Sequence, residues 1–320
     1  MLTIGVDLGG TQIRAGLFDE AGGLLFKHED LTLAHEGAEA VIGRIIEGIR
    51  RVVSYAQEQG HGENITGIGI GCPGPLDPFT GVVLSPSTLP GMVDIPLQHI
   101  VHSEFGLPVY VNNDANAAAL GEWLYGSGRG TNNMIYLTIS TGIGAGIVID
   151  GRLLLGEQGS AGEVGHMIID PYGPMCSCSN RGCWEACASG TAIADIAIER
   201  LANETSDSQL RQITGPVTAK EVITAALNND RLAMEIMEQT RIYLGIGLIN
   251  MINLFNPQKV VIGGGVSKAG DFLLQPAVDM AKQRSQPGMN DVAFVMAELG
   301  DDVGLYGAAA LVSYQKQLRK

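Results

Sequence analysis

The feature that most constrains this chain is a short hairpin pattern that occurs twice. The first copy, residues 4–18, holds Asp7-Leu8-Gly9-Gly10-Thr11, and the second, residues 137–150, holds Ser140-Thr141-Gly142-Ile143-Gly144. Glycine suits a turn with positive φ or a backbone that a ligand approaches closely, and turn amides with Thr hydroxyls suit an anion. Two ordinary β-hairpins would give the same pattern. The pair, with an Asp opening the first turn, favours two turns that grip one polyphosphate.

Length and composition favour a protein of two domains that does not bind polyanions. The chain has 320 residues, of which 45% are hydrophobic, so it can form two domains with large cores. Its net charge of −14 disfavours nucleic acids and anionic membranes, which attract basic surfaces. It contains neither an apolar run of about 18 residues nor a secretory signal pattern. We therefore expect a cytoplasmic protein without disulfides.

Strands alternate with helices along most of the chain, which predicts layered α/β domains. A helix expected over residues 38–59 separates the first hairpin from strands at 65–70 and 109–111. A glycine-rich break at 125–133 precedes the second hairpin, and a final helix is expected over 304–320.

A polar run follows the strand at 109–111. It reads Asn112-Asn113-Asp114-Ala115-Asn116 and precedes a helix expected over 117–125. Helix capping is one explanation, because Asn and Asp are favoured N-caps, but capping needs only one of these residues. Ligands of open α/β sheets bind at the carboxyl ends of strands, where an Asp can accept a hydroxyl proton. We therefore favour a functional role for Asp114 over capping.

Four of the five cysteines lie within twelve residues of an otherwise irregular segment. Three of them, Cys176, Cys178 and Cys183, follow His166. Three thiolates and one imidazole complete a closed tetrahedral zinc shell, which is typical of a structural site. Free thiols or redox cysteines are the alternative, which the absence of a Cys-x-x-Cys motif weakens. The pattern predicts a structural zinc ion that orders this segment.

Two glutamates and a third glycine turn complete the candidate residues. Glu163 and Glu185 flank the cysteine segment. Exposed glutamates are common, but carboxylates among Gly, Cys and Trp are good acceptors for sugar hydroxyls. Gly263-Gly264-Gly265 follows a strand at 259–262 and lets a flat base or sugar approach the backbone, although a plain strand-to-helix turn looks the same. No P-loop or dinucleotide fingerprint is present.

Together these motifs resemble the ROK family of sugar kinases and repressors, within the hexokinase/actin/Hsp70-like superfamily. The resemblance covers essentially the whole chain. Its phosphate motifs are Asp7-Leu8-Gly9-Gly10-Thr11 and Ser140-Thr141-Gly142-Ile143-Gly144-Ala145-Gly146. Its sugar motifs are Asn113-Asp114 and Glu163-x-x-His166, the latter continued by Cys176-x-Cys178-x-x-x-x-Cys183-x-Glu185. The last of these is highly specific, whereas the glycine turns are not.

The resemblance implies an α/β, two-domain actin-like ATPase (ribonuclease H-like) fold with an active-site cleft between the domains. The smaller N-terminal domain is expected at residues 1–117, joined by a C-terminal helix at about 303–320. The larger domain is expected at 118–302 and carries the zinc loop, at about 163–187. The two hairpins would then mark the two walls of the cleft.

The family also implies a role for each matched residue, with Asp114 as the general base. The residues implied to hold the sugar are Gly74, Asn113, Asp114, Glu163, His166 and Glu185. Those implied to bind ATP and its Mg²⁺ are Asp7, Gly9, Gly10, Thr11, Thr141, Gly142, Gly264 and Gly265. The implied ligands of the structural Zn²⁺ are His166, Cys176, Cys178 and Cys183.

The chain departs from the family pattern at Gln12, at Ser179 and in the sugar loop. Gln12 replaces the commoner Lys, and Ser179 replaces the Gly that usually follows the second zinc cysteine. The sugar loop, residues 88–92, reads Thr-Leu-Pro-Gly-Met where the family often has Asn-Leu-Pro-Gly-Trp. The loss of this Asn bears on one sugar hydroxyl, and so on which sugar is preferred.

We therefore expect a homodimer or homotetramer that uses ATP to phosphorylate a hexose, with the 6-hydroxyl of glucose as the expected acceptor. Neither a nucleic acid nor a membrane is an expected partner. The alternatives are N-acetylmannosamine kinase, fructokinase, allose kinase and a polyphosphate-using glucokinase. Repressors of the family carry a helix-turn-helix ahead of the first hairpin, but only three residues precede Ile4 here. A sugar-responsive regulator without catalysis is therefore the less favoured hypothesis.

Overall fold

The computed structural model describes residues 1–205 and 207–318, which fall into two compact units. The first unit contains residues 1–132, 146–162 and the described chain from residue 297 onward. The second unit contains residues 133–145 and 163–296. The chain therefore passes from one unit to the other at 132/133, 145/146, 162/163 and 296/297.

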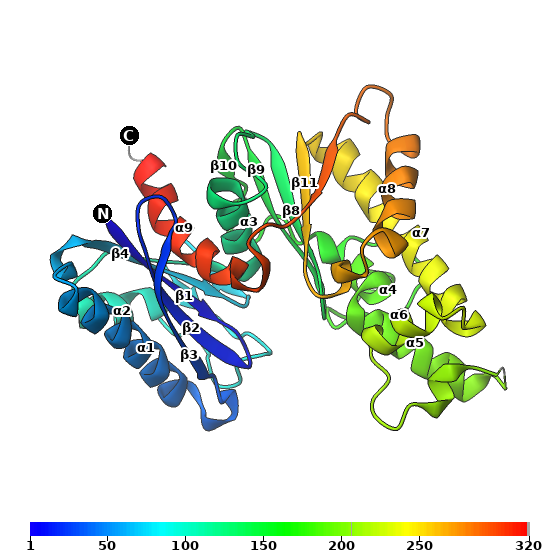
Figure 1. Cartoon of the computed structure of the whole chain (residues 1–320), viewed down its shortest axis with the longest axis horizontal. Coiled ribbons are helices and arrows are strands. Elements are labelled where there is room, and N and C mark those ends of the chain that lie inside the picture. Colours follow the sequence, from blue (N-terminus) through cyan, green and yellow to red (C-terminus); the bar gives the residue numbers. More distant parts are fainter. Residues whose placement is uncertain (206, 319–320) are drawn as a thin grey trace. The chain divides into compact units, whose positions relative to one another are not determined.

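A five-stranded mixed sheet forms the centre of the first unit, in the order β3-β2-β1-β4-β7 (Figure 1). Its strands are β1 (Leu2–Leu8), β2 (Gln12–Phe18), β3 (Leu24–Leu31), β4 (Ile65–Cys72) and β7 (Val109–Asn113). The strand β2 runs antiparallel to both β1 and β3, whereas β4 runs parallel to β1 and β7 parallel to β4. The carboxyl ends of β1, β4 and β7 therefore lie at one edge of the sheet, where ligands of such sheets bind.

Helices cover both faces of this sheet (Figure 1). Apolar residues at helical spacing, among them Val41, Ile45 and Ile49, bury one side of α1 (Ala38–Glu58) against β2 and β3. On the other face α9 (Val303–Leu318) packs on β1 and β4. That packing needs glycine at positions 5 and 69, because a side chain at either would collide with the backbone of α9. The unit also contains α2 (Leu97–Phe105), α3 (Asp114–Tyr125), β5 (Leu76–Asp77) and β6 (Val82–Val83).

A second sheet has the order β10-β9-β8-β11-β12, with β11 parallel to both β8 and β12. Its strands are β8 (Met134–Ile139), β9 (Ile143–Ile149), β10 (Arg152–Leu153), β11 (Lys259–Gly263) and β12 (Ala293–Met296). The strand β9 enters the first unit at Gly146, and β10 belongs to that unit. The helices of the second unit are α4 (Trp184–Ala188), α5 (Gly190–Asn203), α6 (Ala219–Leu227), α7 (Arg231–Phe255) and α8 (Asp271–Arg284). Trp184 is fully buried and packs against α7 at Gly247, where a side chain would strike the indole.

Most of the elements expected from the sequence are present, including both hairpins and the helix that follows the first. One boundary was wrong: the helix expected from Ala117 begins three residues earlier, at Asp114. Asn113 causes this early start, because its side chain caps the helix by accepting a hydrogen bond of 2.9 Å from the Ala115 amide. The final helix begins at Val303, and residues 319 and 320 of its expected range lie outside the described residues.

The two compact units differ from the domains expected from the family resemblance. The expected boundary at 117/118 falls inside α3, and the chain from Gly146 to Gly162 belongs to the first unit. The division into residues 1–117 with about 303–320, and 118–302, stays a prediction. Among the described residues, no helix combines the length and apolar composition that a membrane span requires.

Candidate functional site

The first turn, Gly9–Thr11, joins β1 to β2 in the first unit. The Gly9 amide donates to the Gln12 carbonyl at 2.9 Å, which closes the turn, and Gly10 and Thr11 are exposed. Behind it, the buried Thr32 donates its hydroxyl to the Gly9 carbonyl at 2.6 Å. The three residues expected to contact phosphate therefore form one exposed turn with its backbone fixed from behind.

Asp7 is the penultimate residue of β1, beside this turn, and lies directly opposite Arg14 on β2. The Arg14 Nε donates to Asp7 Oδ2 at 3.1 Å, and Nη2 contacts the same oxygen. Burial raises the pKa of Asp7 above its ordinary value, while the Arg14 guanidinium opposes that rise. Arg14 also donates to the Asp301 carbonyl at 2.6 Å, so it links Asp7 to the segment that leads into α9.

The ends of β4 and β7 bring the remaining candidates of the first unit together. Cys72 pairs with Asn113 across the two strands. A side chain at Gly74 would lie 3.4 Å from the Asn113 amide nitrogen, so the two residues are neighbours. Asp114 is exposed as the first residue of α3, and its Oδ1 accepts from the Ala115 amide at 2.8 Å.

The register of the strands brings their three ends together: Asp7 of β1 lies opposite Gly71 of β4, which lies opposite Asn112 of β7. Burial raises the pKa of the Cys72 thiol to about 12, and the charges of Asp114 and Asp7 add to that rise. Both carboxylates are therefore close to one buried, neutral thiol. The carboxyl edge of this sheet carries two acids, one capping amide and an exposed glycine turn.

The second turn, Ser140–Gly142, joins β8 to β9 in the second unit. Two amides at the start of α5 hold it: Gly190 donates to the Ser140 carbonyl at 2.7 Å, and Thr191 to the Thr141 carbonyl at 3.2 Å. Glu185 closes the turn from α4, since its Oε2 accepts from the Ile143 amide at 3.0 Å. A residue expected to bind sugar therefore contacts the turn expected to bind phosphate.

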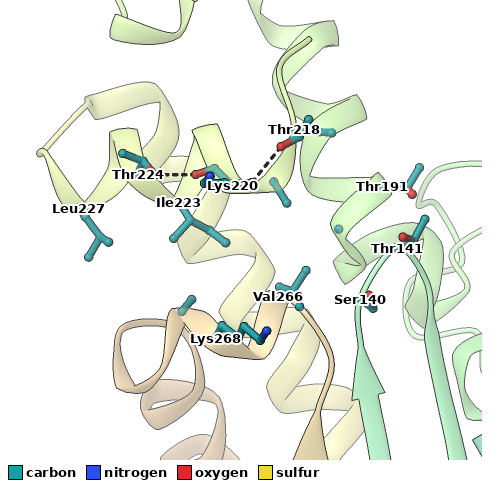
Figure 2. A pocket seen from close by; sticks show the side chains of 15 residues that line it. Ser140, Thr141, Thr191, Thr218, Lys220, Ile223, Thr224, Leu227, Val266 and Lys268 are labelled. Carbon is teal, nitrogen blue, oxygen red and sulfur yellow. Dashed lines mark hydrogen bonds between the residues drawn. The ribbon is translucent and has the colours of Figure 1, made fainter. Parts of the chain in front are cut away.

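A pocket of about 660 Å³ opens beside the second turn and lies entirely within the second unit. Ser140 and Thr141 line one end, and the α6 residues Ile223, Thr224 and Leu227 line the other (Figure 2). Its volume is within the range of about 300–1,000 Å³ that is typical of small-molecule sites. Turn residues and a helix start at one end suit an anion, and the aliphatic lining at the other suits a flat apolar group.

The third glycine turn forms the floor of this pocket. Gly265 lines it together with Val266 and Lys268, which lie across from α6 in Figure 2. Gly264 has a φ of +91°, and a side chain there would collide with the Ile139 carbonyl at the end of β8. Glycine at 264 is thus required for β11 to leave the sheet next to the second turn.

His166, Cys176, Cys178 and Cys183 form the cluster that the sequence predicts, with one ligand atom of each residue within 4.8 Å of the others. The Nδ1 atom of His166 lies 3.6 Å from Cys176 Sγ, and Cys178 Sγ lies 3.6 Å from Cys183 Sγ. A tetrahedral zinc with Zn–S bonds of about 2.3 Å separates its sulfurs by roughly 3.8 Å. Both the donor set and the spacing therefore fit a tetrahedral metal ion.

The electrostatics of these thiols also suit a metal. Hydrogen bonding, foremost from the Asn180 backbone, lowers the pKa of Cys178 to about 7, which favours its thiolate at neutral pH. Burial raises the pKa of Cys183 to about 12. A metal ion bound here would displace the proton from Cys183, because metal ligands bind in their deprotonated form.

Glu163 and His166 lie close to Glu185. Glu163 is exposed, and its carbonyl accepts from the His166 amide at 3.1 Å. Between them, Gly165 leaves no room for a side chain, because its neighbours are the Ile143 carbonyl and the Glu185 side chain. The second unit thus gathers Glu163, His166 and Glu185 around the start of β9.

Each unit gathers its own share of the predicted residues. The first unit contains Asp7, Gly9, Gly10, Thr11, Gly74, Asn113 and Asp114, and the second contains Thr141, Gly142, Glu163, His166, Glu185, Gly264 and Gly265.

Four residues of the site were not predicted from the sequence: Arg14, Thr32, Lys220 and Lys268. Arg14 could have been found, since a charged residue seven positions after Asp7 lies opposite it in a tight hairpin. The other three depend on contacts between distant segments.

The chain is similar to known proteins over nearly its whole length. The profile of the ROK family matches residues 3–315. A glucokinase of Halalkalibacterium halodurans is 40% identical over 98% of this chain and 95% of its own length. A ROK family glucokinase from Streptomyces griseus, solved in complex with glucose and AMPPNP, is 34% identical with a TM-score of 0.76, over 97% of this chain and 99% of that one. A putative xylose repressor of Caldicellulosiruptor is 34% identical over 97% of this chain and 78% of its own length.

Proposed function

Because the chain belongs to the ROK family, we propose that it is an ATP-dependent hexokinase that converts glucose to glucose 6-phosphate. The observation that carries the proposal is the position of Asp114, exposed at the carboxyl edge of the first sheet beside Asn113 and Gly74. The identity to glucokinases at full length supports glucose as the acceptor. The two-domain actin-like fold is that of the relative solved with glucose and AMPPNP.

Asp114 is the general base in this proposal. Its carboxylate accepts the proton of the 6-hydroxyl as the hydroxyl oxygen attacks the γ-phosphorus of ATP, and ADP leaves in line. Proton transfer of this kind contributes about 10²–10⁴-fold to a rate. The remaining catalysis of phosphoryl transfer is positioning and electrostatic stabilisation, which the two glycine turns supply through their amides.

The pocket beside the second turn is our proposed site for the nucleoside of ATP. Its aliphatic side, formed by Ile223 and Leu227, would cover the base, and Gly265 would lie against the adenosine. Ser140 and Thr141 at the other end would face the phosphates. Lys220 and Lys268 also line the pocket, and their positive charges would favour a nucleotide over a neutral ligand.

Asp7 is the residue that would face the Mg²⁺ of the nucleotide. Both guanidinium contacts of Arg14 are to Oδ2 of Asp7, so the arginine holds this carboxylate through one of its two oxygens. Carboxylate oxygens are ligands that Mg²⁺ prefers, directly or through water. The ion, when bound, neutralises charge on the phosphates.

The residues proposed to hold the sugar are those that the family resemblance implies: Asn113, the backbone at Gly74, Glu163, His166 and Glu185. His166 can serve both the metal and the sugar, because Nδ1 faces Cys176 and Nε2 lies on the other side of the ring. We propose a structural Zn²⁺ in the Cys₃His cluster, which would fix the orientation of this imidazole.

The test measures ADP release with ATP as the donor across hexoses and N-acetylhexosamines, and formation of the sugar phosphate with polyphosphate as the donor. We expect glucose with ATP to give the highest kcat/KM. Turnover that is higher with N-acetylmannosamine, fructose or allose would correct the substrate but keep the chemistry. The absence of turnover with every sugar and either donor would refute the kinase proposal. The domain boundaries and the homo-oligomeric state stay predictions.

A further inference from the structure

We propose that Thr32 is a positioning residue that sets the first turn for phosphate binding. The inference rests on the proposed function, since the first turn is there the part that orients the β- and γ-phosphates. Thr32 follows β3 and lies 21 residues after Thr11 in sequence. Its hydroxyl and its amide act on the two ends of a turn that is otherwise exposed.

Two hydrogen bonds from one residue fix the turn. The Thr32 hydroxyl donates to the Gly9 carbonyl at 2.6 Å. The Thr32 amide donates to the Thr11 carbonyl at 2.8 Å, which continues the β2–β3 ladder beyond the pair of Gln12 with Leu31. Both carbonyls are therefore held by a buried residue, while Gly10 and Thr11, the residues proposed to meet the phosphates, are exposed.

Burial makes the hydroxyl bond hard to replace. The side chain of Thr32 is fully buried and Gly9 is half-buried, so a methyl group in place of the hydroxyl would leave the Gly9 carbonyl without this donor. A buried acceptor that loses its donor is more costly than an exposed one. The turn would respond by rotating the Gly9–Gly10 peptide, and that rotation would move the amides meant for phosphate.

Thr32 is itself anchored to a helix. Arg44 of α1 donates from Nη1 to the Thr32 carbonyl at 3.0 Å, and its Nη2 pairs with Glu36. A continuous series of hydrogen bonds therefore links α1 to the turn: Arg44 donates to Thr32, and Thr32 donates to Gly9. On the opposite side of the turn, Gly10 packs against Thr88, whose carbonyl oxygen would lie 3.1 Å from a side chain at position 10.

The test replaces the hydroxyl and keeps the shape. Thr32→Val removes the donor, Thr32→Ser keeps it, and Thr240→Val is the matched control. Thr240 is also fully buried and donates its hydroxyl to a backbone carbonyl, that of Ile236 at 2.9 Å, on α7 of the second unit. Steady-state kinetics, calorimetric binding of MgADP and of glucose, and thermal midpoints are measured for each variant.

We expect Thr32→Val to lower kcat/KM for MgATP by about 10–100-fold, because small misplacements of a binding group cost up to about 10² in rate. The dissociation constant of MgADP should rise about tenfold, and that of glucose should change less than twofold. Thr32→Ser should recover most of the loss. Thr240→Val should lower the thermal midpoint as much as Thr32→Val and leave the kinetic constants within twofold of the wild type.

If Thr32→Val lowers only the thermal midpoint, as the control does, the positioning role is wrong. It is also wrong if Thr32→Ser fails to restore MgADP binding, because the hydroxyl is then not the group that matters. Should Thr32→Val not fold, Arg44→Gln tests the same series of hydrogen bonds from its half-buried end on α1. MgADP binding should be about threefold weaker if the inference is correct and unchanged if it is not. A wild type without hexokinase turnover would refute the proposed function alone, since MgADP binding still tests Thr32.

Discussion

The β1–β2 turn of the first unit and the β8–β9 turn of the second are alike in sequence, but different groups hold them. The first turn rests on one buried hydroxyl, that of Thr32, and begins after an acid paired with Arg14. The second is held by two amides at the start of α5 and by the carboxylate of Glu185. Each turn has exposed residues at its tip.

The two turns also differ in the groups that lie beside them. The first turn lies at a sheet edge that also carries Asp7 and Asp114, so it combines amides with titratable acids. The second turn has no acid in the turn itself and borders the pocket of about 660 Å³. We infer that the acids of the proposed reaction belong to the first unit, and that the second unit supplies the pocket proposed for the nucleoside.

The largest effect should come from the acid edge of the first unit. Asp114→Asn keeps the size of the side chain but removes the base, so kcat should fall by about 10²–10⁴-fold. Glucose binding, measured by calorimetry, should stay within about threefold of the wild type, because the hydrogen-bonding amide of Asn can replace one carboxylate oxygen. Undiminished kcat in this variant would remove Asp114 from the base role and with it the contrast between the units.

Loss of the metal should act on the second turn and spare the first. Glu185, which closes the second turn, lies two residues after the ligand Cys183. In Cys178→Ser, bound zinc should fall well below one equivalent and the thermal midpoint should drop by ~6 °C or more. The loss of a metal is among the changes that cost over about 3 kcal/mol of unfolding free energy, and each kcal/mol shifts the midpoint by roughly 2–4 °C.

Cys187→Ser is the control for this variant, because Cys187 is buried in the same segment but lies outside the ligand set. Hydrogen exchange should quicken at the Ile143 amide in Cys178→Ser and stay slow at Gly9. Equal quickening at both amides would show that the two turns do not depend on separate supports, and a wild type without metal by elemental analysis would refute the zinc site.

Two glycine variants compare the turns directly. In Gly142→Ala the new methyl group would strike Glu185 Oε2, whereas in Gly10→Ala it would lie 3.1 Å from the Thr88 carbonyl. Overpacking typically costs about 1–3 kcal/mol, so Gly142→Ala should raise the KM for glucose about tenfold by displacing Glu185. Gly10→Ala should raise the KM for glucose about threefold, because Thr88 belongs to the sugar loop at residues 88–92 and the contact with it is less severe. A change in the KM for ATP alone in both variants would separate the turns from the sugar residues.

The sequence predicted the parts of this arrangement that depend on local chemistry. Alternating strands and helices and the spacing of the three cysteines follow from residues close in the chain, whereas the helix start at Asp114 and its Asn113 cap were not predicted. The supports of the turns did not follow, because Thr32 reaches Gly9 across 23 residues and Glu185 reaches Ile143 across 42. The α6 wall of the pocket was missed for the same reason, since Ile223 and Leu227 read only as the apolar side of a helix.

The smallest effect should separate two cations that contact the same acid of the first unit. Arg14 and Lys27 both pair with Asp302, at 3.4 and 2.9 Å, but only Arg14 also contacts Asp7. Hydrogen bonds to charged groups contribute about 1.5–3 kcal/mol, less where water competes, so Arg14→Gln should raise the Mg²⁺ concentration for half-maximal activity about threefold to tenfold. Lys27→Gln removes a more exposed ion pair and should leave it unchanged. Titration of Mn²⁺ with ADP, followed by electron paramagnetic resonance, measures cation binding without turnover and should weaken in Arg14→Gln but not in Lys27→Gln. Equal effects of the two variants would mean that Arg14 acts through Asp302 rather than through Asp7.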